Sequence, residues 1–162
     1  MIPADRAQIT FLPHSSTEAV LFRLSGSLTI STLEKVEQDF DLHLPKCPGK
    51  KVIMDLSQTP FVSSTGWSFF LYTHARLRAM EGELLLAGMK PEILMIFEML
   101  DFGNFMRHFP TVAEALTYSR SLSAAGKSGE PVPAVPDMAR PPKKGWRALI
   151  SSPARRRLGG EN

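Results

Sequence analysis

The sequence predicts one α/β domain with a mixed, largely parallel sheet of four or five strands and four helices mainly on one face. Short β-prone runs alternate with amphipathic stretches of about 10 to 15 residues, which is typical of strands joined by crossover helices. Residues 51–56 form a nearly continuous apolar run, as expected for a central strand covered on both faces. The helical segments are too few to cover both faces evenly.

The first half of this domain holds three strands and one helix. Residues 9–12 are a short strand candidate, and residues 20–24 are a stronger one closed by Ser25-Gly26. Apolar residues at helical spacing then follow Ser31 or Thr32 as cap, namely Leu33, Val36 and Phe40. Prolines 45 and 48 lie in the loop that leads to the strand at 51–56.

The second half predicts three more helices. The Ser-Ser-Thr-Gly stretch opens a helix that Gly82 stops, with a buried stripe of Trp67, Phe70, Leu71, His74 and Leu77. After a strand at 83–87, Pro91 starts a helix broken by Gly103, with a buried face of Ile93, Ile96, Phe97 and Leu100. Residues 105–109 suggest a last strand, and the Thr111–Glu114 capping box predicts a helix to about Ser119.

Charge divides the chain into two regions. Residues 1–120 hold 11 Lys and Arg against 13 Asp and Glu, whereas residues 121–162 hold 8 against 3, a net charge of +5. The second region is rich in Pro, Gly, Ser and Ala, so it buries too little apolar surface to offset its chain entropy. We therefore expect a domain over 1–120 and a basic, Pro-rich, disordered tail over 121–162.

Composition excludes several classes of protein. One cysteine, Cys47, allows no intrachain disulfide, and the longest apolar stretch is far short of the roughly 20 residues of a membrane span. The four histidines are scattered without ligand spacing, so no metal site is expected, and no cofactor. No acid–base or nucleophile set can be assembled, which predicts a non-enzymatic protein of the cytoplasm.

One segment carries a family resemblance. Asp55-Leu56-Ser57 is followed after four residues by Val62-Ser63-Ser64-Thr65-Gly66-Trp67, with Phe61 as the expected buried aromatic of the turn. Together with Gly26-Ser27-Leu28-Thr29, Glu81-Gly82-Glu83 and Pro91, in that order, it resembles the STAS family over about residues 8–119. That family includes the bacterial anti-sigma factor antagonists and the cytoplasmic domains of sulfate transporters.

The resemblance implies a site. It places the family's phosphorylatable serine at Ser64, where a helix N-terminus favours an added phosphate. The implied partner-binding surface comprises Ser27, Thr29, Ser63, Ser64, Thr65, Gly66 and Trp67. A hydroxyl at this position is also an ordinary N-cap, and Trp67 fits the core stripe slightly better than an exposed anchor. Ser27, Thr29 and Ser63 replace acidic residues of phosphorylated members, which argues for impaired phosphorylation.

Three functions are compatible with the sequence. The first is a non-catalytic adaptor in a partner-switching circuit, bound to an anti-sigma factor or a kinase-like ATPase. The second is a soluble subunit of an ABC-type membrane transporter, and the third is a nucleotide or small-molecule sensor around Gly26 and Ser63. The basic tail is expected to contact an acidic partner or an anionic surface, and no direct nucleic-acid binding is expected.

Overall fold

A computed structural model describes residues 6–12, 19–44 and 51–125 of the chain. They form a five-stranded sheet in which the spatial order of the strands equals their order in the sequence. The first strand pairs antiparallel with the second, and every later pair is parallel. The strands are β1 (Gln8–Leu12), β2 (Ala19–Ser25), β3 (Lys51–Gln58), β4 (Glu83–Ala87) and β5 (Arg107–Phe109). The mixed, largely parallel sheet is thus confirmed.

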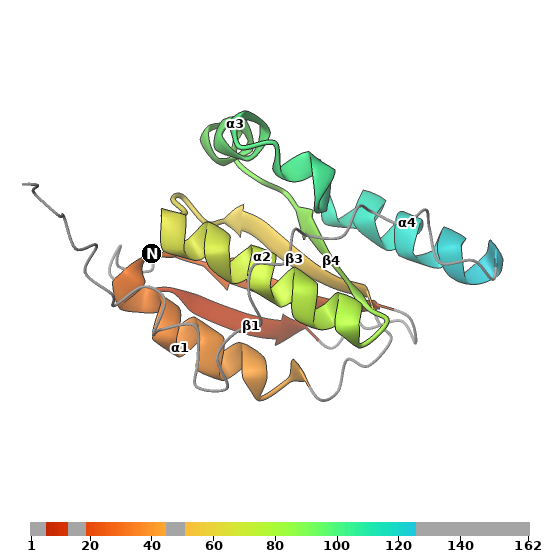
Figure 1. Cartoon of the computed structure of the whole chain (residues 1–162), viewed down its shortest axis with the longest axis horizontal. Coiled ribbons are helices and arrows are strands. Elements are labelled where there is room, and N and C mark those ends of the chain that lie inside the picture. The colour runs from red at the N-terminus through yellow and green to blue at the C-terminus, as the bar shows by residue number, and fades with distance from the viewer. Residues whose placement is uncertain (1–5, 13–18, 45–50, 126–162) are drawn as a thin grey trace, which may run out of the picture.

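Four α-helices cover this sheet unequally (Figure 1). The helices are α1 (Ile30–Asp41), α2 (Ser64–Ala79), α3 (Pro91–Met99) and α4 (Val112–Ala125), with a 3₁₀ turn, η2, at Phe102–Asn104. The first three pack in one apolar cluster with one face of the sheet, and α4 packs in a smaller cluster on the other face. The expectation of helices mainly on one face is therefore confirmed.

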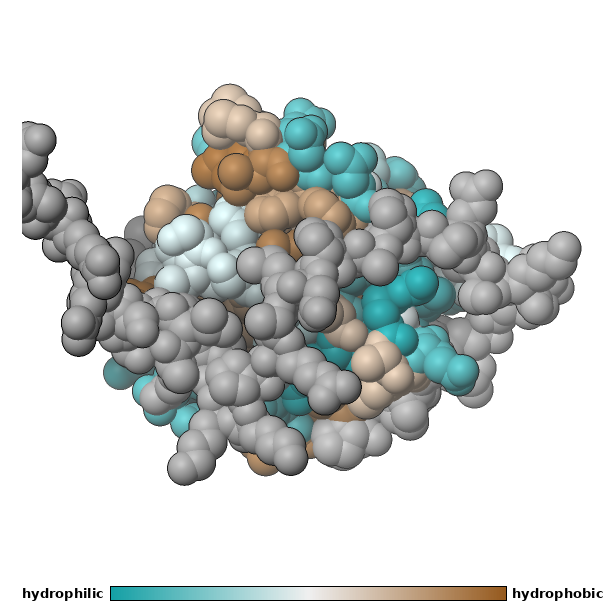
Figure 2. Space-filling model, in the orientation of Figure 1, coloured by the Kyte–Doolittle hydropathy of each residue, from teal (hydrophilic) through white to brown (hydrophobic). Residues whose placement is uncertain are grey.

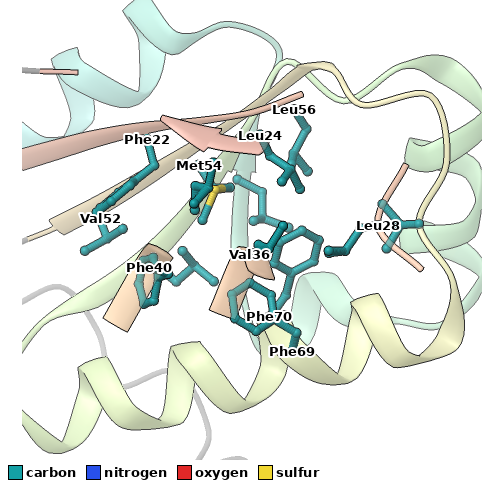
Figure 3. Packing of buried hydrophobic residues seen from close by; sticks show 14 of the residues in the cluster. Phe22, Leu24, Leu28, Val36, Phe40, Val52, Met54, Leu56, Phe69 and Phe70 are labelled. Atoms are coloured by element: carbon teal, nitrogen blue, oxygen red, sulfur yellow. The ribbon is translucent and has the colours of Figure 1, made fainter. Parts of the chain in front are cut away.

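Alternating side chains of the central strands build the larger cluster. Phe22 of β2 and Met54 of β3 point toward Phe40 of α1, and Phe69 and Phe70 approach from α2 (Figure 3). All five are fully buried. Because β3 is covered on both faces, its run from Val52 to Leu56 stays inaccessible to solvent, as a central strand requires.

Helix ends show where the expected boundaries were wrong. The N-cap of α1 is Thr29, two residues before Ser31 and three before Thr32, the two expected caps, so the helix begins early, at Ile30. The left-handed residue after α2 is Glu81 (φ 61°), not Gly82, and α3 ends at Met99 before Asp101 (φ 54°), ahead of Gly103. Both residues lie in turns directly after a helix, and the short side chain of Asp101 is of a type that adopts the left-handed conformation more often than most.

Burial also differs from the predictions on α2 and α3, where Ile96 of the predicted buried face is only partly buried. Leu100 is exposed, because it follows the last residue of α3 and leaves the buried face. Leu71 is only partly buried on α2, whereas Phe69, absent from the predicted stripe, is fully buried. Helix α4 continues to Ala125, past the expected end at Ser119. The basic residues of the predicted tail lie outside the described residues.

Charged groups gather where the parallel strands begin. Glu83 accepts from Lys51 Nζ at 2.8 Å and lies 3.4 Å from Arg107 Nε, with its carboxylate almost fully buried. Burial lowers the pKa of His74, although the nearby Glu83 carboxylate opposes the shift. Burial raises the pKa of Tyr118, whose ring packs under the Arg107 guanidinium. This cluster lies at the amino ends of the parallel strands, opposite the loops that open α1 and α2.

Candidate functional site

Two loops meet at the carboxyl ends of β2 and β3. Leu28 and Val62 form an isolated parallel bridge, in which Leu28 N donates to Phe61 O and Ser63 N donates to Leu28 O, both at 2.9 Å. A third bond runs from Gly26 N to Gln58 O at 3.0 Å. The two segments identified in the sequence, 26–29 and 62–67, therefore lie side by side and fix the starts of α1 and α2.

The first turn of α2 separates the roles of its two serines. Ser63 is the N-cap, because its Oγ accepts from Gly66 N at 3.2 Å and lies 2.7 Å from the Thr65 hydroxyl. Ser64 is the first helical residue and is exposed, and its hydroxyl makes no hydrogen bond to another described residue. The capping interpretation thus applies to Ser63, and the Ser64 hydroxyl is left open to solvent.

Hydroxyl groups also close the start of α1. The backbone N–H of Thr29 donates to Thr32 Oγ1 at 3.0 Å, and Thr32 Oγ1 donates to Ser27 O at 2.8 Å. The Thr29 hydroxyl lies 2.9 Å from that of Ser31. Ser27 and Thr29 are half-buried and are tied into this turn, so they shape the loop beside Ser64.

Two of the predicted contact residues do not face solvent. Trp67 is 3% exposed and packs against Phe70, Phe97 and Phe102, so its assignment to a partner-binding surface was wrong and the core alternative is confirmed. Gly66 is buried as well, and a Cβ there would lie 2.8 Å from Val62 Cγ1. Both residues support the site from beneath.

Two apolar residues at the site were missed by sequence reasoning. Phe61, expected to be buried, is 50% exposed, and Ile30, the first residue of α1, is 66% exposed. Phe61 lies in a loop, where no periodic pattern reports burial. Ile30 lies before the buried residues Leu33, Val36 and Phe40 of α1, and its position one residue ahead of the expected cap was the available sign that it is exposed. Phe61 directly precedes Val62 of the bridge, and Ile30 follows two residues after Leu28.

The resulting surface is uncharged and hydroxyl-rich. We define it as the serine face: Ser27, Thr29, Ile30, Phe61, Ser63, Ser64 and Thr65. Helices α1 and α2 both begin at this surface, so their dipoles give it a positive local potential without any charged side chain. Among the described residues, no group of three or more His, Cys, Asp or Glu could hold a metal ion, and no helix is long and apolar enough to cross a membrane.

Comparisons with known proteins agree with this arrangement. A curated relative from Bordetella bronchiseptica, named "Putative anti-sigma factor antagonist BtrV", is 29% identical over 102 residues, covering 63% of this chain and 80% of its own length. An anti-sigma factor antagonist from Mycobacterium paratuberculosis superposes with a TM-score of 0.62 at 22% identity, covering 74% of this chain and 97% of that one.

A third similar protein is SpoIIAA of Bacillus, whose structure is known in two states. The unphosphorylated form gives a TM-score of 0.58 at 21% identity, over 70% of this chain and 97% of SpoIIAA. The phosphorylated form gives 0.52 at 21%, over 68% and 98%. The model of the STAS domain matches residues 12–115, from the end of β1 into α4. This chain belongs to the STAS domain family.

Proposed function

We propose that this protein is a non-catalytic, cytoplasmic switch of the anti-sigma factor antagonist type, which binds an anti-sigma factor or a kinase-like ATPase through the serine face. The observation that carries this proposal is the exposed Ser64 at the start of α2, with the exposed Phe61 and Ile30 on the two loops that meet there. The relative from Bordetella bronchiseptica supports the class of partner. Exposed aromatic and aliphatic side chains supply the apolar contact area on which protein interfaces depend.

Phosphorylation of Ser64 would reverse this binding. A phosphate adds about −1.5 to −2 charges at neutral pH. On an otherwise uncharged face, a partner would have to desolvate that charge or meet it with a like charge, and the complex would weaken. The α2 N-terminus would stabilise the phosphate on the free protein, so the fold itself would not change. The Leu28–Val62 bridge holds both loops in place in either state.

The absence of carboxylates sets the expected rate of this modification. Ser27, Thr29 and Ser63 stand where phosphorylated members of the family carry acidic residues. The Thr29 hydroxyl contacts that of Ser31, and the Ser63 hydroxyl accepts from Gly66 N. If those acids orient the nucleotide or the hydroxyl, phosphorylation of this chain is slow or absent. Partner binding through the serine face does not depend on it.

Affinity purification from the source cells, followed by mass spectrometry, tests the partner class. We expect the Ser64→Ala protein to co-purify with a kinase-like ATPase. The Ser64→Glu protein should not, because its affinity for that partner should be at least about tenfold weaker. Intact mass before and after phosphatase treatment reports whether native Ser64 is modified. Thr117→Glu, at an exposed hydroxyl on α4 across the sheet, is the matched charge control and should bind like the wild type.

Two results would contradict the proposal. Equal binding by Ser64→Glu and wild type would place the interface elsewhere on the domain. Recovery of a permease with its own ATPase, and of no anti-sigma factor, would support the transporter-subunit alternative instead.

A further inference from the structure

The outward face of α3 is apolar. Met95 and Met99 are 61% and 69% exposed, and Leu100 directly after the helix is also exposed. Ile93 and Phe97 fill the inward face, so α3 is apolar on both sides. Figure 2 shows hydrophobic residues gathered over α3 at the top of the molecule. A solvated surface helix normally carries polar residues on this side.

Carboxylates border this face. Glu92, Glu98 and Asp101 are all exposed. Within residues 90–101, the single Lys or Arg is Lys90. Met95 lies three residues from both Glu92 and Glu98, so the carboxylates flank the methionine along the helix surface. Methionine side chains are flexible and polarizable, and they adapt to apolar segments of irregular shape. The surface therefore fits a segment that combines apolar anchors with cations.

The chain itself contains such a segment outside the described residues. Residues 143–150, Lys-Lys-Gly-Trp-Arg-Ala-Leu-Ile, hold three cations and no acid, together with Trp146, Leu149 and Ile150. Basic residues interleaved with aromatic and aliphatic anchors are what methionine-rich acidic surfaces bind. The charge of the segment complements that of α3.

The connection is long enough for contact within one molecule. Helix α4 ends at Ala125, and residues 126–142 lie between it and the basic segment. A Pro-rich connection of this length reaches up to about 50 Å, which exceeds the roughly 35 Å diameter of a domain of this size. Such tethering gives an effective concentration in the millimolar range, so a contact with a Kd of about 1 mM would already be half occupied.

From these observations we infer that residues 143–150 dock in cis on the outward face of α3, with Trp146 against Met95 and Met99 and the three cations near Glu92, Glu98 and Asp101. This contact uses a surface other than the serine face and does not require a partner protein.

Methionine-methyl NMR on the full chain tests the inference. An indole ring shifts the resonance of a methyl group that it contacts, so Trp146→Leu should move the Met95 and Met99 signals. The fully buried Met54 and Met106 serve as internal controls for the fold and should not move. Leu158→Ser, outside the basic segment, is the matched tail control and should leave all four signals in place.

Salt and dilution identify the occupant. Raising the ionic strength should shift the Met95 and Met99 signals toward their positions in Trp146→Leu, because the contact includes charge attraction. Dilution should leave them unchanged. If Trp146→Leu moves neither signal, tail docking is wrong. If the shifts disappear on dilution, the face binds a second copy of the chain, and the cis contact is also wrong.

Discussion

Gly66→Ala tests how tightly the two loops of the serine face are joined. The added Cβ would lie 2.8 Å from Val62 Cγ1 and 3.0 Å from Leu28 Cγ. Carbon atoms in favourable contact are about 3.5–4.0 Å apart, so one of these side chains must move by more than half an ångström. Both belong to the parallel bridge and are buried, and the β-branched Val62 has few alternative rotamers.

The expected magnitude is the difference between two effects. Overpacking a buried site costs about 1–3 kcal/mol. Alanine is preferred over glycine in a helix by about 1 kcal/mol, and Gly66 lies in the first turn of α2. We therefore expect a net loss of about 1 kcal/mol in the free energy of unfolding, or a Tm lower by about 4 °C for a domain of this size.

Thermal and urea denaturation measure this loss, and two further variants isolate its cause. Gly103→Ala is the matched control, because its Cβ would lie 3.7 Å from Phe97 Cε1, an ordinary contact. Adding Val62→Ala should reduce the cost of Gly66→Ala, since it removes the closest opposing atom. A Gly66→Ala protein as stable as the wild type would refute the account of a tightly packed bridge.

Three other predictions concern single side chains. Asp55→Asn should lower the free energy of unfolding by about 1–3 kcal/mol, because the buried carboxylate is held by Arg23 Nε at 2.9 Å. Asp39→Asn, at a half-buried carboxylate paired with the exposed Lys35, should change that free energy by less than about 0.5 kcal/mol. Burial lowers the pKa of His74 below 6.5, so the unfolded chain binds that proton first. The stability that neutral His74 contributes is present above about pH 6.5 and falls below it, and a pH series of urea denaturation should show less of this decline in His74→Gln. Phe61→Ser should leave Tm nearly unchanged and weaken partner binding about tenfold in a titration; equal affinity would remove Phe61 from the interface.

Sequence periodicity predicted the elements well because most of them bury one face. The strand at 83–87 was predicted with its observed bounds, since its five residues are all apolar or paired in the buried sheet. The sequence did not decide whether Trp67 lies in the core or on the surface, because a residue in the first turn of a helix can face either way. Three-dimensional packing against Phe97 and Phe102, far along the chain, settles its burial.

The site was harder to predict than the fold. Neighbouring Ser63 and Ser64 are chemically equivalent in the sequence, and only the backbone geometry decides that the first caps the helix and the second faces solvent. The exposure of Phe61 depends on the hydrogen bonds that hold its loop against residue 28. Such contacts between segments more than 30 residues apart have no local sequence signal.

The strand order has a consequence for how the chain reaches its native state. Because each strand pairs with the one synthesised just before it, the sheet can grow outward from β1 while later residues are still on the ribosome. No strand has to insert between two that are already paired, so the search for native pairings stays short in sequence separation. The loops of the serine face meet once β3 and the start of α2 have emerged, well before α4 is made.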